Sequence, residues 1–460
     1  MSAIYVPEII HPLVRRHVED AAFYWSQHDA CSYSPVLNLS GLMRFSDLLV
    51  AHLDGVEAAG SAGWAPALAA LERWKQPGEA FVCAYSALSR DDAVQTDALL
   101  QHVSARPDEL LRGVISALLW IPRDRAATIV KRWIQPDSSP LKQVAALRAA
   151  ALFDHHAGDT PLIDASVLTL LLSNADANAN AHVRAAACRV AATVARSAHN
   201  APLLEALHLC LEDTETAVRA QAAICLGRFK TTDNGADEAQ HIAIAEVLWQ
   251  CVVVQVNALN AASGWYRKQA LRRLLKWVQH LAMQIPAGHP QLGALLAYMP
   301  ARVSLHFIAY HGDPMHLPYV LGQMSDEANA RYAGWVWRTL TGVDMQVERL
   351  CLPEPEWPDQ EISEARLDAD LGLPLPDVER IRAYSLPSLK DGQRYLLGHI
   401  LSPAYALNLM SDAKQAWRSI ASNYLQSLNP LARAAMGGEA RRQMALNRSL
   451  SDLFTAEEAI

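Results

Sequence analysis

The sequence predicts an all-α protein built as a superhelical stack of helix pairs. Two observations predict this fold class. A motif centred on arginine recurs about every 35 residues between positions 111 and 331, and 51% of the residues are hydrophobic without any long uninterrupted apolar run. Helix pairs of this length cannot bury their apolar faces alone, so they have to stack on their neighbours.

The recurring motif is an apolar or small residue, then arginine, then mostly small residues. Leu111-Arg112-Gly113-Val114 and Val183-Arg184-Ala185-Ala186 are two examples. The arginines follow one another at steps of 36, 36, 35, 48, 35 and 29 residues, at Arg112, Arg148, Arg184, Arg219, Arg267, Arg302 and Arg331. The step of 48 is one repeat plus an insertion, which we assign to the polar segment 231–240.

Each motif is expected to begin the second helix of a helix–turn–helix unit. Polar breaks such as QPDSSP at 135–140 precede the motifs, and apolar periodic stretches such as PLLEALHLCL at 202–211 precede the breaks. The small residues let neighbouring helices approach closely, because Ala adds little bulk and keeps full helix propensity. The spacing and the V-R-x-x-A pattern resemble HEAT repeats, which form α-solenoids.

The repeated arginines are expected to have a structural role as a ladder along the stack. Acidic residues lie just ahead of the motifs, at Asp108, Asp137, Asp176 and Asp213. An arginine can therefore donate charge-assisted hydrogen bonds to the acidic turn of an adjacent repeat. A row of ligand-binding arginines is the alternative.

The repeats divide the chain into four predicted regions. An N-terminal helical unit at 1–90 precedes the HEAT-like repeats at 91–345. Six prolines and an acidic bias then indicate an extended arm at 346–390. A C-terminal helical cap, expected to cover the open end of the stack, occupies 391–460.

Landmarks along nearly the whole chain resemble an uncharacterised bacterial family of HEAT-repeat proteins. They are the opening around Asp20-Ala21-Ala22-Phe23, the segment AHLDG at 51–55, PGEAF at 77–81, Thr341-Gly342, and a late G-x-RYL-x-G from Gly392 to Gly398. Members are often encoded beside type VI secretion genes for spike proteins and PAAR-tipped effectors. The resemblance implies an accessory factor, adaptor or chaperone in effector delivery, with no established activity.

No residue pattern predicts a catalytic site, a metal or a cofactor. The closest histidine groups are His155-His156 with Asp159, and His306, His311 and His316 with Asp313. Neither group has an i, i+4 histidine pair with a third ligand, as an H-E-x-x-H site would. His52 and Asp54 of AHLDG face away from each other on a helix, so we expect a cap or an inter-helix contact there.

A basic stripe is the one candidate for partner binding. Lys268, Arg272 and Lys276 lie at i, i+4 and i+8, opposite Leu271, Leu274, Leu275 and Val278. Such a stripe can receive an acidic protein segment or phosphates. A solvated helix face is the alternative interpretation.

Composition and charge narrow the class of protein further. The net charge of −8 gives no overall attraction to nucleic acid or anionic lipid. The seven cysteines form no CxxC pair and are expected to be reduced core residues. The apolar stretch at 247–254 is well short of the ~20 residues of a membrane helix, and the N-terminus lacks an apolar signal core, so we expect a cytoplasmic protein without a transmembrane segment.

These observations favour a scaffold or adaptor that binds another protein, with a type VI effector, a PAAR protein or a spike protein as the expected partner. Two other classes of function stay open. An enzyme would carry its site in a pocket on the concave face of the solenoid. A nucleic-acid-binding HEAT protein would need several basic stripes in one groove, and the sequence has one good example.

Overall fold

A computed structural model describes residues 9–153, 161–173, 180–198, 200–229, 235–353, 370, 372–386, 388–432, 434 and 436–455. Within them the chain is mostly α-helical, as predicted from the sequence, and one short β-hairpin is the exception. The chain divides into two compact units. Unit 1 contains Met1–Ala222 together with Leu431–Ile460, and unit 2 contains Ala223–Pro430.

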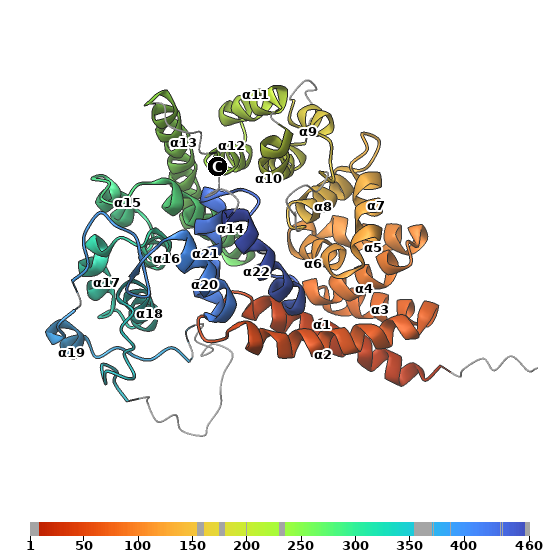
Figure 1. The fold of residues 1–460 in the computed structure, drawn as a ribbon. Helices are drawn as coiled ribbons and strands as arrows, with labels where there is room; N and C mark the ends of the chain where they lie inside the picture. Colours follow the sequence, from red (N-terminus) through yellow and green to blue (C-terminus); the bar gives the residue numbers. More distant parts are fainter. Residues whose placement is uncertain are drawn as a thin grey trace, which may run out of the picture. The chain divides into compact units, whose positions relative to one another are not determined.

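Unit 1 consists of helices from both ends of the chain (Figure 1). Short 3-10 turns lie at Gly60–Gly63 and Cys210–Glu212. The α-helices are α1 (His11–Cys31), α2 (Leu39–Ala58), α3 (Trp64–Trp74), α4 (Pro77–Ser89), α5 (Ala93–Ala105), α6 (Pro107–Trp120), α7 (Arg123–Trp133), α8 (Pro140–Ala150), α9 (Ala165–Leu172), α10 (Ala181–Ala198), α11 (Ala201–Leu209) and α22 (Ala440–Thr455). Helix α12 (Thr216–Leu226) contains the division at Ala222.

Unit 2 contains the remaining helices and a two-stranded antiparallel sheet. A 3-10 turn lies at Pro314–His316. The elements are α13 (Gly235–Ala261), α14 (Gly264–Gln284), α15 (Leu292–Tyr298), α16 (Ala301–His311), α17 (Leu317–Gln323), α18 (Ala330–Thr341), α19 (Val378–Ala383), β1 (Tyr395–Leu396), β2 (His399–Ile400), α20 (Pro403–Asp412) and α21 (Gln415–Leu428).

The seven arginine motifs lie on seven even-numbered helices, α6 to α18, with one α-helix between each successive pair. Within unit 1, α4, α6, α8 and α10 pack in succession, and within unit 2, α14, α16 and α18 do the same. The long step of 48 residues between Arg219 and Arg267 contains α13, which at 27 residues is the longest described helix. The insertion therefore lengthens a helix as well as adding polar residues before it.

Glycine permits the closest approach between helices α4 and α6. A Cβ atom added at Gly113, the residue after Arg112, would lie 2.3 Å from the backbone oxygen of Pro77 and 2.7 Å from the backbone nitrogen of Phe81. Gly78 of PGEAF meets helix α1 in the same way, 2.6 Å from the oxygen of Ala22. The small residues of the motifs therefore set the inter-helix distance here.

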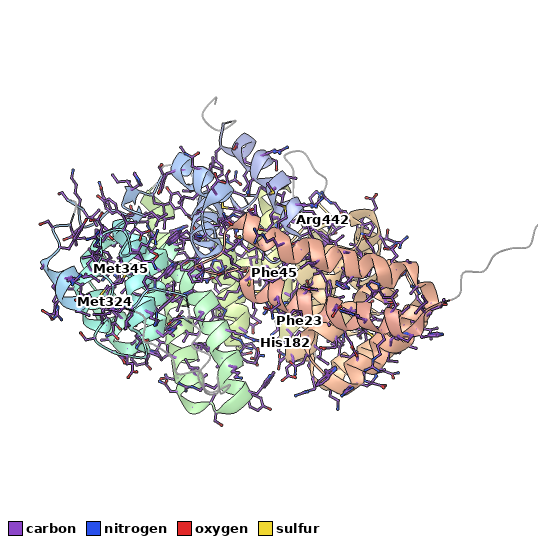
Figure 2. All side chains as sticks on the ribbon, turned by 90° about the horizontal axis from the view of Figure 1, so that it is seen from below. Phe23, Phe45, His182, Met324, Met345 and Arg442 are labelled. Atoms are coloured by element: carbon purple, nitrogen blue, oxygen red, sulfur yellow. The ribbon has the colours of Figure 1, made fainter. Side chains whose placement is uncertain are left out.

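We expected residues 391–460 to form one helical cap, but the helices of this region are divided between the two units. Helices α20 and α21 pack together in unit 2, whereas α22 packs on α2 in unit 1. The backbone nitrogen of Ala440 donates to Ser46 Oγ, and Arg442 (Figure 2) donates to the carbonyl oxygens of Leu119 and Trp120 at the end of α6. The segment before these helices forms the β-hairpin, which the sequence did not predict.

The described parts of the expected arm at 346–390 are packed against the fold. Leu350 and Leu373 are buried, and Cys351 forms a β-bridge with Pro376. The most acidic stretch of the arm, 354–369, lies outside the described residues.

One helix among the described residues, at Glu238–Ala261 within α13, is long and apolar enough to cross a membrane by length and composition alone. The stretch 247–254 considered from the sequence is only part of it. In the structure Leu248, Val252 and Val256 of this helix are buried, and α13 packs against α14.

Candidate functional site

Helix α14 carries the basic stripe predicted from the sequence. Lys268, Arg272 and Lys276 are all exposed. The opposite face of the helix is buried at Leu274 and Val278, and α14 packs against α13, α16 and α21. Spacing by four places the cations on one side of the helix, because four residues complete slightly more than one turn.

This surface carries more positive charge than the three predicted cations supply. Arg273 is exposed next to Arg272, and the ring of Tyr266 is 73% exposed at the start of the helix. Within the part of the chain that the structure describes, Lys268, Arg272 and Arg273 form no ion pair with a carboxylate. We call Tyr266, Lys268, Arg272, Arg273 and Lys276 the α14 basic face.

The ladder arginines have several kinds of partner. Arg184 forms two hydrogen bonds to Asp213 in the acidic turn of the next repeat, as the ladder requires. Arg148 is half-buried, and desolvation by burial lowers the pKa of its guanidinium while the charge of Asp108 opposes that shift. Asp176 lies outside the described residues.

The other arginines of the series do not pair with the aspartate carboxylates of the acidic turns ahead of the motifs. Arg112 pairs with Asp29 at the end of α1, and Arg302 pairs with Asp370. The rest bind backbone oxygens: Arg219 binds Asp213 and Thr214, Arg267 binds Leu259, and Arg331 binds Leu373. The sequence pattern therefore locates structural arginines, and tertiary packing selects the acceptor of each.

The histidines singled out near the end of the repeats separate into two places. His306 belongs to a polar network in which its Nε2 lies 2.9 Å from Gln279 Nε2 and its Nδ1 lies 2.9 Å from the hydroxyl of Tyr332. Burial, with the positive charge of Arg302, lowers the pKa of His306 to about 3, so its ring is neutral at pH 7. Because an amide nitrogen can only donate, Gln279 donates to the unprotonated Nε2, and Nδ1–H of His306 donates to the hydroxyl of Tyr332.

His311, Asp313 and His316 lie together beside the β-hairpin. Asp313 is fully buried and accepts hydrogen bonds from the backbone nitrogens of Gly288 and Met315 at 2.6 and 3.0 Å. The ring centroids of His311 and His316 are 5.6 Å apart, and burial holds the pKa of His311 well below its usual value. Hydrogen bonding to the backbone gives this aspartate a structural role.

The G-x-RYL-x-G segment forms the hairpin and holds the ends of three helices. Arg394 donates to backbone oxygens at the ends of α14 and α16, namely those of Ala282, Met283, Ile285 and His311. The backbone nitrogen of Leu397 donates to Thr339 of α18. Gly342 and Gly398 both have positive φ, and their backbones approach so closely that a Cβ at Gly342 would lie 2.3 Å from the oxygen of Leu397.

An open cleft borders this hairpin and was missed from the sequence, because two-residue strands give no periodic signal. The rings of His399 and Tyr405 lie with their centroids 4.9 Å apart, and burial raises the pKa of Tyr405. Among the described residues, no carboxylate lines the cleft. Its lining residues are Ser388, Lys390, Gln393, Tyr395, Gly398, His399, Ile400 and Tyr405.

In the AHLDG segment, His52 makes an inter-helix contact and Asp54 is exposed. His52 Nδ1 lies 3.1 Å from Nδ1 of His17 on α1. Phe23, which belongs to the landmark Asp20-Ala21-Ala22-Phe23 on α1, is 56% exposed (Figure 2). The partner of His52 comes from a separate helix, so the sequence spacing of His52 and Asp54 does not reveal it.

Across the described ranges, no group of three or more His, Cys, Asp or Glu residues is arranged to hold a metal ion. All seven cysteines are free thiols, and five of them are buried. His155, His156 and Asp159 lie outside the described residues.

Comparison of the chain with protein-family models, with curated proteins and with solved structures finds no match.

Proposed function

We propose that this protein is an interaction scaffold or adaptor that binds an acidic protein surface through the α14 basic face. The observation that carries the proposal is the set of exposed cations Lys268, Arg272 and Arg273 beside the exposed ring of Tyr266, none of the three cations having a carboxylate partner within the described residues. Tyr and Arg are enriched at protein interfaces, and complementary charge accelerates association.

The proposal includes a HEAT-like α-solenoid as the scaffold. Its support is the placement of all seven arginine motifs on alternate helices, and the packing of α6, α8 and α10 in one unit and of α14, α16 and α18 in the other. A stack of helix pairs offers an extended surface, which suits a macromolecular partner.

The resemblance of the sequence to the bacterial HEAT-repeat family supports a particular context. In that context the partner is a type VI secretion effector, a PAAR protein or a spike protein, and the scaffold acts in the cytoplasm as an accessory factor or chaperone before secretion. The structural landmarks of the resemblance stabilise the fold, as Arg394 and Gly78 do, so a partner-binding role falls to other residues.

A nucleic acid is the alternative ligand for the same surface. The net charge of −8 opposes it, since phosphate binding depends on many cations. An enzyme is the other alternative, with the cleft around His399 and Tyr405 as the place for substrate.

The test is affinity capture from the native host followed by mass spectrometry, with three forms of the protein. The wild type is compared with the double variant Lys268→Glu/Arg272→Glu and with the control Arg44→Glu/Lys131→Glu. The control makes the same change of charge at exposed positions in unit 1. We expect the wild type and the control to retain a partner with an acidic surface, and the α14 variant to lose it.

Two outcomes would contradict the proposal. Equal recovery of partners by all three forms would reduce the α14 basic face to a solvated helix surface. Recovery of nucleic acid, with an affinity that falls steeply with salt, would replace the protein partner by a nucleic acid.

A further inference from the structure

Two imidazoles face each other across the first helix pair. His17 of α1 and His52 of α2 lie 35 positions apart in the sequence, and their Nδ1 atoms are 3.1 Å apart. The two helices pack along their length through buried residues that include Val18, Leu49 and Val56. Because this core fixes the helices, it also fixes the distance between the two rings.

The surroundings of both rings are specialised for this close approach. Gly55 leaves the space that the His17 ring occupies, since a Cβ atom there would lie 2.7 Å from Cγ and Nδ1 of His17. Tyr24 stacks on the His52 ring with a centroid distance of 5.4 Å and an interplanar angle of 22°. His52 keeps 21% of its side chain exposed, so a small solute can reach the pair from solvent.

A nearby carboxylate favours one tautomer of His52 electrostatically. Asp20 Oδ2 lies 3.8 Å from Nε2 of His52 and 3.4 Å from Nε of Arg16. Asp20 favours a proton on Nε2, which leaves Nδ1 of His52 with its lone pair facing His17. Desolvation by burial lowers the pKa of His52, which keeps the ring neutral at neutral pH.

The spacing matches two adjacent positions in the coordination sphere of a metal ion. With metal–nitrogen bonds of about 2.0–2.1 Å, two nitrogens are about 2.9 Å apart at a right angle and about 3.4 Å apart at the tetrahedral angle. The observed 3.1 Å lies between these values. A carboxylate behind a coordinating histidine, as Asp20 is here, is the usual outer partner of such a ligand.

We propose that His17 and His52 chelate one divalent transition-metal ion through their Nδ1 atoms, with water in the remaining positions and Asp20 as the positioning residue behind His52. Two metal–nitrogen bonds replace two metal–water bonds of the hydrated ion, the two waters pass to solvent, and the hydrogen bond between the rings is lost. The proton on Nδ1 of His17 moves through solvent to Nε2 of the same ring, so neither imidazole gains or loses a proton overall. The metal ion keeps its oxidation state. The waters leave the metal open to a further ligand.

Isothermal titration of the full, tag-free protein with CuCl₂ in a non-chelating buffer tests this site. We expect saturable binding of one Cu²⁺ per chain in the wild type. His17→Gln and His52→Gln should each weaken it by more than about tenfold, and Asp20→Asn by about tenfold. The control His182→Gln removes an exposed histidine elsewhere in unit 1 (Figure 2) and should leave the affinity unchanged.

A second readout identifies the ligands directly. The electron paramagnetic resonance spectrum of the copper-loaded wild type should show coupling to two nitrogens, and the spectrum of Asp20→Asn should keep both. Asp20→Asn retains both rings, so it still tests the site if a histidine variant does not fold. Absence of one-to-one binding, or binding that the His17 and His52 variants leave unaltered, would overturn the proposal and leave a hydrogen-bonded histidine pair.

Discussion

Arg184 and Asp213 form a buried, two-pronged ion pair between α10 and the turn that precedes α12. The Nε–Oδ2 and Nη2–Oδ1 distances are 2.8 and 3.1 Å, and the side chains are 5% and 3% exposed. The same carboxylate accepts from the backbone nitrogen of Glu215 at 2.8 Å. The pair therefore joins one repeat to the turn of the next.

We expect Arg184→Ala to lower the free energy of unfolding by about 3–5 kcal/mol, because it leaves the Asp213 carboxylate buried without its counter-ion. Arg132→Ala is the matched control, since Arg132 pairs with Asp91 at the surface with side chains 52% and 41% exposed. That change should cost about 1 kcal/mol or less. Urea denaturation followed by circular dichroism measures both, and equal losses would contradict the inter-repeat role of Arg184.

The space around two helical glycines predicts opposite effects on stability when each is replaced by alanine. Gly113→Ala places a methyl group against the backbone of Pro77 and Phe81, so it should destabilise unit 1 by about 2 kcal/mol or more. Gly293→Ala on α15 meets nothing within 4 Å and should stabilise its helix by about 0.5–1 kcal/mol. Thermal unfolding midpoints that move in the same direction would argue against this account.

Arg394 is expected to be essential to the stability of unit 2. Arg394→Met removes hydrogen bonds to four helix-end carbonyls and should cost about 3 kcal/mol or more. Arg394→Lys keeps the charge without the planar fork and should restore only part of the loss. Hydrogen exchange across α14 and α16 measures the effect, with Arg382→Met as an exposed control.

Buried neutral histidines predict a loss of stability on the acid side of neutrality. Burial lowers the pKa of His28 to about 4, and burial together with Arg302 lowers that of His306 to about 3. In the unfolded chain both titrate near 6.5, so the unfolded state binds more protons below that pH. The contribution of these two histidines to the free energy of unfolding is fully present above pH 6.5. It falls as the pH drops, by at most about 1.4 kcal/mol per pH unit for each histidine.

Urea midpoints measured at pH 7.5, 6.5 and 5.5 test this window, which lies above the range where most carboxylates titrate. His28→Gln removes one of the titrating groups and should reduce the slope by up to one proton. A midpoint that is constant from pH 7.5 to 5.5 would show that these histidines are protonated without cost.

The mostly helical character of the chain could be predicted from the sequence because local chemistry specifies helices. Each arginine motif follows a polar break and begins an apolar periodic stretch, and every one of the seven lies on a helix. The stripe of Lys268, Arg272 and Lys276 followed from helical geometry alone. Both predictions needed only residues that are close in the sequence.

Features that depend on distant residues could not be predicted in this way. Tertiary packing determines the acceptor of each ladder arginine. Arg112 therefore pairs with the carboxylate of Asp29, and Arg331 donates to the backbone oxygen of Leu373. His52 pairs with a histidine 35 positions away, and no local pattern indicates it. The hairpin at β1 and β2 depends on helix ends that precede it by about 55 to 110 positions, as the contacts of Arg394 and Leu397 show.

The path of the chain through unit 1 has a consequence for the order of folding during synthesis. Helix α22 hydrogen-bonds to α2 and to the end of α6, yet all of Ala223–Pro430 is translated between those helices and α22. Unit 2 is continuous in sequence and can fold as soon as it leaves the ribosome, whereas unit 1 leaves Leu39 and Leu42 without the covering contact of Ala440 until α22 emerges. Full protection of that surface therefore comes later than the synthesis of unit 2, and the nascent chain is exposed to aggregation or to chaperone binding until then.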